Sequence, residues 1–136
     1  MFALGRLFNL GISATTSNTP IALKDCTSVG IIVTGATSGN VTIQEATSAA
    51  GAGAQNLARI TRYYTQASGV WTLRTQAAAA TVTCVTGGLL YVDIEASWLS
   101  DNYDYISASH SSATMVYVAH GLEVQRNPTM LAAWNA

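Results

Sequence analysis

Short runs of alternating apolar and polar residues recur along the middle of the chain, separated by Gly, Ser and Asn. Eight strand-like runs are present, at residues 29–34, 41–45, 57–66, 70–76, 81–86, 89–96, 103–109 and 113–119, of which the first is a compact apolar run. Alternation indicates half-buried strands, and the turn residues between the runs favour short connections. We therefore predict an all-β protein without a long helix.

The run at 89–96 alternates most strongly. Its aliphatic residues share one parity and its polar residues the other: Leu90, Val92 and Ile94 against Tyr91, Asp93 and Glu95. This pattern predicts a strand with one buried and one wet face. The four alanines at 77–80 are too few for a stable helix, so we predict a connection there.

Eight short antiparallel strands in about a hundred residues fit two sheets packed face to face, in a jelly-roll-like order. The rival is an immunoglobulin-type sandwich, because the spacing of Cys26 and Cys84 is close to that of its two cysteines. That fold places its core tryptophan soon after the first cysteine, whereas Trp71 comes late. The jelly-roll-like sandwich therefore ranks first, with two unpaired buried cysteines in a reducing cytoplasm.

The only prolines, Pro20 and Pro128, bracket the folded body. We predict three parts: an N-terminal arm at 1–19, a β-sandwich body at 20–127 and a C-terminal arm at 128–136. Both arms carry apolar residues, which favour docking onto a partner or back onto the core. Four of these are predicted as partner-binding anchors: Phe2, Leu4, Phe8 and Trp134.

Charge is scarce along the whole chain. Charged residues make up 10% of it, the formal net charge is −1, and 62 of the 136 residues are Ala, Gly, Ser or Thr. Nucleic-acid binding needs clustered Lys and Arg, and no stretch reaches the roughly 18 apolar residues of a membrane span. We therefore predict no direct contact with nucleic acid or membrane.

No arrangement of residues predicts an active site. The two histidines, His110 and His120, lie in or beside turns, and no serine has a nucleophile-elbow pattern around it. Asp101 and Asp104 are more readily explained as turn residues than as calcium ligands. We predict no catalytic residue, no metal and no cofactor.

Arginine and tyrosine occur together at Arg59, Arg62, Tyr63 and Tyr64. The same mixture serves single-stranded nucleic acids, but a nearly neutral chain favours a protein–protein interface, where Arg and Tyr are enriched. Arg59, Arg62 and Tyr63 are therefore predicted partner-binding residues.

In the order and composition of three segments, the chain resembles small cement or decoration proteins of tailed-bacteriophage heads. These segments are GNVTIQEATSAAGAGAQ, RYYTQASGVWTLRT and LLYVDIEASWLSDNYDYISAS. The resemblance implies a jelly-roll-like subunit made in the host cytoplasm and carried on the outer surface of the capsid. It also implies a major capsid protein as partner, and dimers or trimers, of which we favour the homodimer.

Two alternatives remain. One is another virion component, such as a tail- or fibre-associated protein. The other is a carbohydrate-binding sandwich, whose sugar rings would stack on Trp71, Trp98, Tyr103 and Tyr105.

Overall fold

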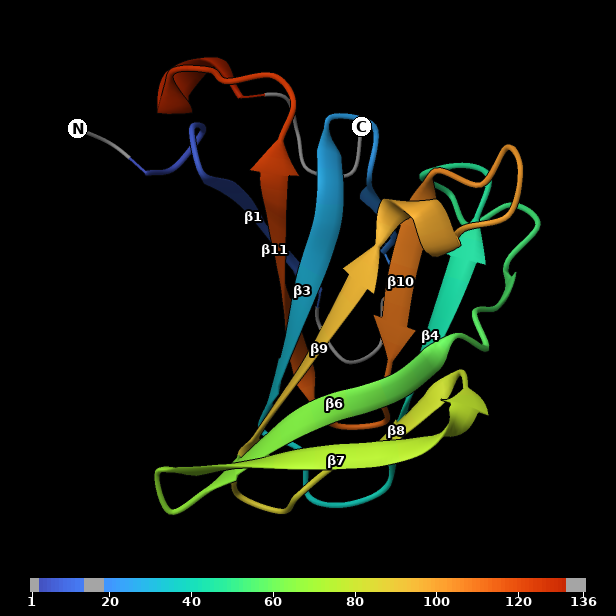
Figure 1. The fold of residues 1–136 in the computed structure, drawn as a ribbon, viewed down its shortest axis with the longest axis vertical. Coiled ribbons are helices and arrows are strands. Elements are labelled where there is room, and N and C mark those ends of the chain that lie inside the picture. Colours follow the sequence, from blue (N-terminus) through green and yellow to red (C-terminus); the bar gives the residue numbers. More distant parts are fainter. Residues whose placement is uncertain (1–2, 14–18, 132–136) are drawn as a thin grey trace.

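The computed structural model describes residues 3–13 and 19–131, which form two antiparallel sheets packed against each other (Figure 1). The strands are β1 (Phe8–Ser13), β2 (Ile21–Ala22), β3 (Cys26–Thr34), β4 (Asn40–Ala46), β5 (Gln55–Asn56), β6 (Ile60–Ala67), β7 (Val70–Ala79), β8 (Thr81–Thr83), β9 (Leu89–Glu95), β10 (Tyr105–Ser109) and β11 (Thr114–Leu122). Two short 3₁₀ turns, η1 (Ala96–Trp98) and η2 (Pro128–Met130), complete the described chain.

The strand order is that of a jelly roll. The larger sheet has the order β1-β11-β3-β9-β6-β7, and the smaller sheet has β2-β10-β4-β5, with β8 also pairing with β4. The chain crosses from one sheet to the other at β1–β2–β3–β4 and again at β8–β9–β10–β11, so strands distant in sequence become neighbours. The predicted antiparallel two-sheet sandwich is confirmed.

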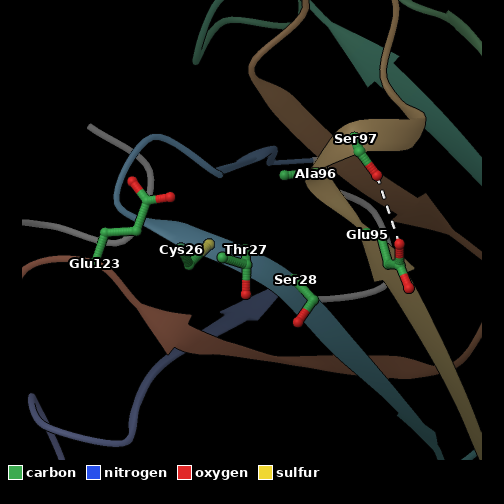
Figure 2. A pocket seen from close by; sticks show the side chains of 7 residues that line it. All are labelled: Cys26, Thr27, Ser28, Glu95, Ala96, Ser97 and Glu123. Carbon is green, nitrogen blue, oxygen red and sulfur yellow. Dashed lines mark hydrogen bonds between the residues drawn. The ribbon is translucent and has the colours of Figure 1, made fainter.

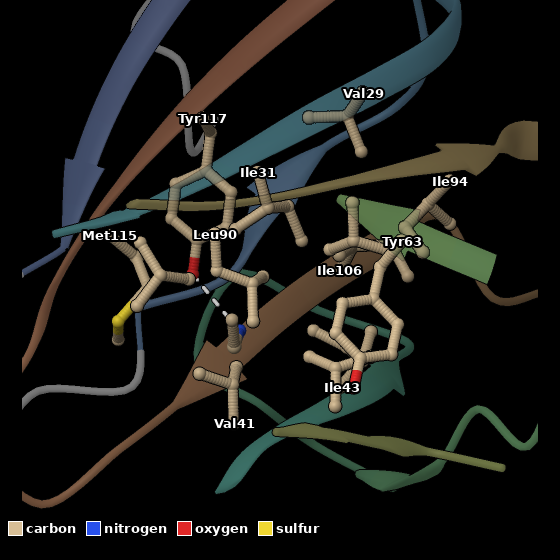
Figure 3. Close-up of a cluster of buried hydrophobic side chains, with 14 of the residues drawn as sticks. Val29, Ile31, Val41, Ile43, Tyr63, Leu90, Ile94, Ile106, Met115 and Tyr117 are labelled. Atoms are coloured by element: carbon tan, nitrogen blue, oxygen red, sulfur yellow. Dashed lines mark hydrogen bonds between the residues drawn. The ribbon is translucent and has the colours of Figure 1, made fainter. Parts of the chain in front are cut away.

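The core lies between the inner faces of the two sheets (Figure 3). Val29, Ile31 and Val33 of β3 face Val41 and Ile43 of β4, and all five are at most 1% exposed. The alternation predicted for residues 89–96 is confirmed, because its aliphatic residues are buried while Asp93 and Glu95 are exposed.

Both cysteines are buried and free, as predicted. Burial, with Asp25 and Glu123 adding to it, raises the pKa of Cys26 to about 11. A thiol with so high a pKa carries little reactive thiolate at neutral pH.

Two tyrosine hydroxyls cross the core and join the sheets. Tyr117 of β11 accepts a hydrogen bond of 2.9 Å from the backbone N–H of Ala108 in β10, drawn in Figure 3. Tyr63 of β6 accepts one of 3.3 Å from the N–H of Thr83 in β8. Each hydroxyl therefore satisfies a backbone donor of the smaller sheet from the larger one.

The facing of Tyr63 depends on an irregularity in the pairing of β6 with β7. Sequence parity puts Ile60 and Tyr63 on opposite faces, but the register with β7 shifts between Ile60 and Arg62, where one residue of β6 stands opposite three of β7. The alternation of β6 breaks at the two exposed residues Thr61 and Arg62, so both Ile60 and Tyr63 are buried. The structure thus places Tyr63 in the core, not at the surface where a partner would bind.

The predicted N-terminal arm includes an ordered edge strand. Residues Phe8–Ser13 pair with β11 along their whole length, and the N–H of Arg126 donates to the carbonyl of Gly5 at 2.8 Å. Phe8, Leu10 and Ile12 alternate with Asn9, Gly11 and Ser13, so the segment carries a strand pattern although its place before Pro20 favoured an arm. The described part of the N-terminal arm therefore packs on the sandwich. Its Gly5 also lies beside the C-terminal arm, because a Cβ there would be 3.5 Å from Cδ2 of Leu131.

Three other elements differ from the sequence prediction. Strand β7 runs on through Ala79, where a connection was expected, because Ala79 pairs again with Ile60 of β6 after an irregularity at residues 76–78. Strands β2 and β5 have two residues each, which is too short for an alternating pattern.

Ser68 and Gly69, which join β6 to β7, both have positive φ, as a type I′ hairpin turn requires.

Among the described residues, Glu45 is the one buried carboxylate, at 2% exposure. It accepts hydrogen bonds from the Gln55 side-chain amide at 2.5 Å and from the Ser100 N–H and hydroxyl at 2.8 and 2.7 Å. Burial acts to raise the pKa of Glu45, but these hydrogen bonds outweigh it and hold the pKa below its ordinary value. Glu45 therefore ties β5 and the segment after η1 to β4.

We expect Tyr117→Phe to destabilise the protein by about 1–3 kcal/mol, because the Ala108 N–H loses its acceptor inside the core. Tyr63→Phe should cost less, since its hydrogen bond is longer. Urea denaturation measures both losses, and Tyr103→Phe, whose hydroxyl bonds at the surface, is the control. Equal stability of the Tyr117→Phe and Tyr103→Phe variants would contradict a stabilising role for the hydrogen bond between Tyr117 and Ala108.

We expect Glu45→Gln to lower the free energy of unfolding by about 1–3 kcal/mol at neutral pH. The N–H₂ group of the new glutamine would face the hydrogen-bond donors of Gln55 and Ser100, to which it offers no acceptor. A carboxyl whose pKa is lower in the folded than in the unfolded protein stabilises the folded protein. This stabilisation is complete at pH values above the unfolded-state pKa, and it is lost as the pH falls through the folded-state pKa. The difference in free energy of unfolding between wild type and Glu45→Gln should therefore become smaller below about pH 4.5. Denaturation curves at several pH values test this, with the exposed Glu95→Gln as control; a gap independent of pH would refute it.

Candidate functional site: the outer face of the larger sheet

The register of the larger sheet aligns six apolar residues on its solvent side. Directly opposed residues of antiparallel strands share a face, and successive pairings link one residue from each strand. The row consists of Ile12, Val116, Ile32, Tyr91, Tyr64 and Leu73. Ile12, Leu73 and Tyr64 are 61%, 52% and 38% exposed, so the row lies at the surface.

Further apolar side chains flank this row. We define the apolar face as the row together with Leu10, Trp71, Leu89 and Val118. The outer side of the smaller sheet is polar by comparison, with Thr42, Gln44, Ser107, Ser109, Thr81 and Thr83. Contiguous exposed apolar surface marks binding sites, so the apolar face is the candidate site.

Tyr91 is fixed at the centre of the apolar face by a glycine. A Cβ at Gly30 would lie 2.6 Å from Cε2 of Tyr91, so the ring occupies the space that a side chain on β3 would fill. Burial, and secondarily the charge of Asp93, raise the pKa of the Tyr91 hydroxyl. The ring is therefore a rigid part of the surface.

Two hollows meet at Tyr64 and Tyr91. The apolar hollow, about 230 Å³, is lined by Ile32, Tyr64, Trp71, Leu89 and Tyr91. The mixed hollow, about 430 Å³, is lined by Thr61, Arg62, Tyr63, Tyr64, Tyr91, Asp93, Glu95 and Trp98. The apolar face therefore contains two depressions, and the charged residues Arg62, Asp93 and Glu95 line only the mixed hollow.

A Ser–His–Asp cluster borders the apolar face. His120 of β11 lies with Nδ1 2.9 Å from the Ser28 hydroxyl and Nε2 2.9 Å from Asp93 Oδ1. The three side chains come from adjacent strands, because Ser28 is opposite His120 in the register. The imidazole thus gives Asp93 a polar partner on a strand face that it shares with the like charge of Glu95.

The surroundings of the Ser28 cluster differ from those of a serine hydrolase. Such an enzyme needs free backbone N–H groups aimed at an oxyanion, and a buried carboxylate. Ser28 lies on an inner strand paired on both sides, with Glu95 and His120, and Asp93 is exposed. The arrangement suits a hydrogen-bonded cross-strand contact.

A third hollow, of about 400 Å³, lies at the end of β3. Figure 2 shows Glu95 and Glu123 flanking Cys26, Thr27 and Ser28 there, with Ser97 donating to Glu95. Within residues 3–13 and 19–131, no three His, Cys, Asp or Glu residues gather to hold a metal ion. In the same ranges, no helix is long and apolar enough to cross a bilayer.

The predicted partner-binding residues do not form one site. Leu4 and Phe8 are half-buried and bridge to each other beside β1. Arg59 and Arg62 are exposed, and Arg62 lines the mixed hollow. Tyr63 belongs to the core, and Phe2 and Trp134 lie outside the described residues.

Sequence reasoning missed the row itself. Each strand showed which residues share a parity, but the row needs the register of six strands, and four of their five pairings join strands distant in sequence. The one available signal was apolar residues on the polar parity, such as Ile32 and Tyr91.

We expect Gly30→Ala to destabilise the protein by about 1–3 kcal/mol, because the new methyl group collides with the Tyr91 ring. Tyr91→Ala removes the collision, so Gly30→Ala should cost almost nothing in that background. Denaturation of the four proteins of this cycle measures the coupling. Equal costs in both backgrounds would show that the ring does not fill the glycine position.

The apolar face is thus a property of this chain's own register and side chains. No protein-family model, no curated protein and no solved structure matches the chain. The chemistry that the apolar face offers is therefore read from its own residues: aliphatic and aromatic side chains in line, with charged side chains on one side only.

Proposed function

We propose that this protein is a decoration protein that binds the outer surface of a bacteriophage capsid and bridges neighbouring major capsid subunits. One observation carries the proposal: the apolar row that crosses all six strands of the larger sheet at the surface. The resemblance in segment order and texture supports the choice of partner.

The row fits a large, flat protein partner better than a small molecule. It is built from interior strands as well as both edges, so the surface is broad and held rigid by the sheet. Interface cores are poor in charge and rich in aromatic residues, and Tyr64, Tyr91 and Trp71 lie together here. A capsid presents such a surface many times over.

Binding only to the assembled shell stabilises the shell by mass action. Exposed apolar residues near the chain ends, such as Leu7 and Met130, extend the surface toward a neighbouring subunit. A non-enzymatic role accords with the exposed Asp93 and the fully paired β3 backbone around Ser28.

Carbohydrate binding is the second candidate, favoured by the mixed hollow. Trp98 and three tyrosines line it beside Asp93 and Glu95, and aromatic rings with carboxylates suit sugar rings and hydroxyls. The aromatic residues that the sequence suggested for this role are dispersed: Trp71 lies on β7, Trp98 in η1, and Tyr105 is buried under Lys24, whose Nζ is 5.2 Å from its ring centre.

The test is co-sedimentation with capsids assembled from the major capsid protein of the same genome. We expect wild type to bind and to raise the heat stability of the shell. Ile12→Asp and Tyr64→Asp place charge on the apolar face and should weaken binding by at least about tenfold. Thr81→Asp, on the polar face of the other sheet, should bind as wild type.

Absence of wild-type binding, or equal binding by all three variants, would overturn the proposal. Specific binding to a glycan array without capsid binding would favour the carbohydrate-binding alternative. Circular dichroism of each variant confirms that the sandwich is intact before binding is compared.

A further inference from the structure

We propose that two copies of this chain pair edge to edge through β7 around a two-fold axis, joining their larger sheets into one continuous antiparallel sheet. This inference does not rest on the proposed function, because it concerns the protein alone in solution. A failure of either proposal leaves the other standing.

Strand β7 is a long uncovered edge. It has ten residues, and in the described part of the chain it pairs with β6 alone. Every residue in it is exposed except Gln76 and Ala79, which are half-buried. An edge strand presents unpaired backbone N–H and C=O groups, which are a template for another strand.

Strand β7 carries few of the devices that usually block such an edge. Its sequence, VWTLRTQAAA, holds no proline and no lysine, and Arg74 is its single charged residue. Arg74 is drawn back from the edge, because its Nε–H donates to Thr65 Oγ1 on β6 at 3.2 Å. The irregularity in its pairing with β6 lies at residues 76–78, so the edge is open to pairing from Val70 to Thr75.

The turn end of the β6–β7 hairpin is exposed. Figure 1 shows the hairpin running across the end of the sandwich, with its turn projecting to one side. Strand β6 pairs with β9 only at Tyr64, Thr65 and Gln66, and Val70 near the turn is 65% exposed. The core holds β6 on one side of the hairpin, so a third strand would add its backbone hydrogen bonds on the free side of β7.

The strand is complementary to itself when the two-fold axis passes through Leu73. Leu73 then lies opposite Leu73 of the second copy, and Trp71 lies opposite Thr75 of the second copy. Each Arg74 faces a Thr72, so no like charges are directly opposed. With a net charge of −1 per chain, long-range repulsion between copies is small.

This register also extends the apolar face. Leu73 ends the row of six on one copy, and opposed residues of antiparallel strands share a face. The two rows therefore become one row on the same side of a joint sheet. An isologous contact of this kind closes at two copies, whereas pairing of β7 with the other edge, β1, would build an open filament.

Cysteine cross-linking tests both the contact and its register. In this arrangement the two Leu73 Cα atoms are about 4.5 or 5.5 Å apart, within disulfide range. Leu73→Cys should therefore oxidise to a covalent dimer. Thr75→Cys is the matched control, on the same strand and face, because two Thr75 positions are offset by four residues, about 13 Å. The native cysteines are buried.

Sedimentation equilibrium gives the second measurement. We expect wild type at twice the 14.2 kDa of one chain, and Leu73→Lys to weaken the dimer by at least about tenfold. A monomeric wild type, a filament, cross-linking of Thr75→Cys as readily as Leu73→Cys, or a dimer unaffected by Leu73→Lys would each overturn the proposal.

Discussion

The packing of two sheets over one shared core is the constraint on which the rest of the structure depends. The inner faces supply aliphatic side chains, and the backbone at the edges of the smaller sheet still needs hydrogen-bond partners in a dry interior. Tyr117 and Tyr63 meet that need from the larger sheet, one at β10 and one at β8. The apolar packing and the hydroxyls together set the position of each sheet on the other.

That packing leaves the two outer faces free to differ. The smaller sheet turns threonine, serine and glutamine outward, whereas the larger sheet turns out a line of aliphatic and aromatic residues. Since hydration of an apolar surface is unfavourable, the larger sheet gains most from a partner. The low charge of the chain fits this, because few ionic groups must be desolvated when a partner covers the face.

The free edge of the larger sheet adjoins its apolar face, because β7 carries Leu73, the last residue of the row. Strand β7 stands at the end of the apolar row, so whatever pairs with its backbone also prolongs the row. A second copy would double the apolar surface without any change within the subunit. In the role that we propose at a capsid, a two-fold pair would provide two identical contacts held at a fixed distance, and two linked contacts bind more strongly than one.

The sequence by itself determined the all-β class, most of the strands and the buried residues on them, because a period of two is local information that survives without knowledge of the partners. It did not place the alternating residues Phe8–Ser13 in the sheet, because their partner β11 lies about a hundred residues away, and it did not reveal the irregularity between β6 and β7 beside which Tyr63 turns inward. Only the tertiary structure decided the apolar row and the Ser28–His120–Asp93 contact. Register between strands far apart in sequence is set by whole-sheet packing, and no local pattern encodes it.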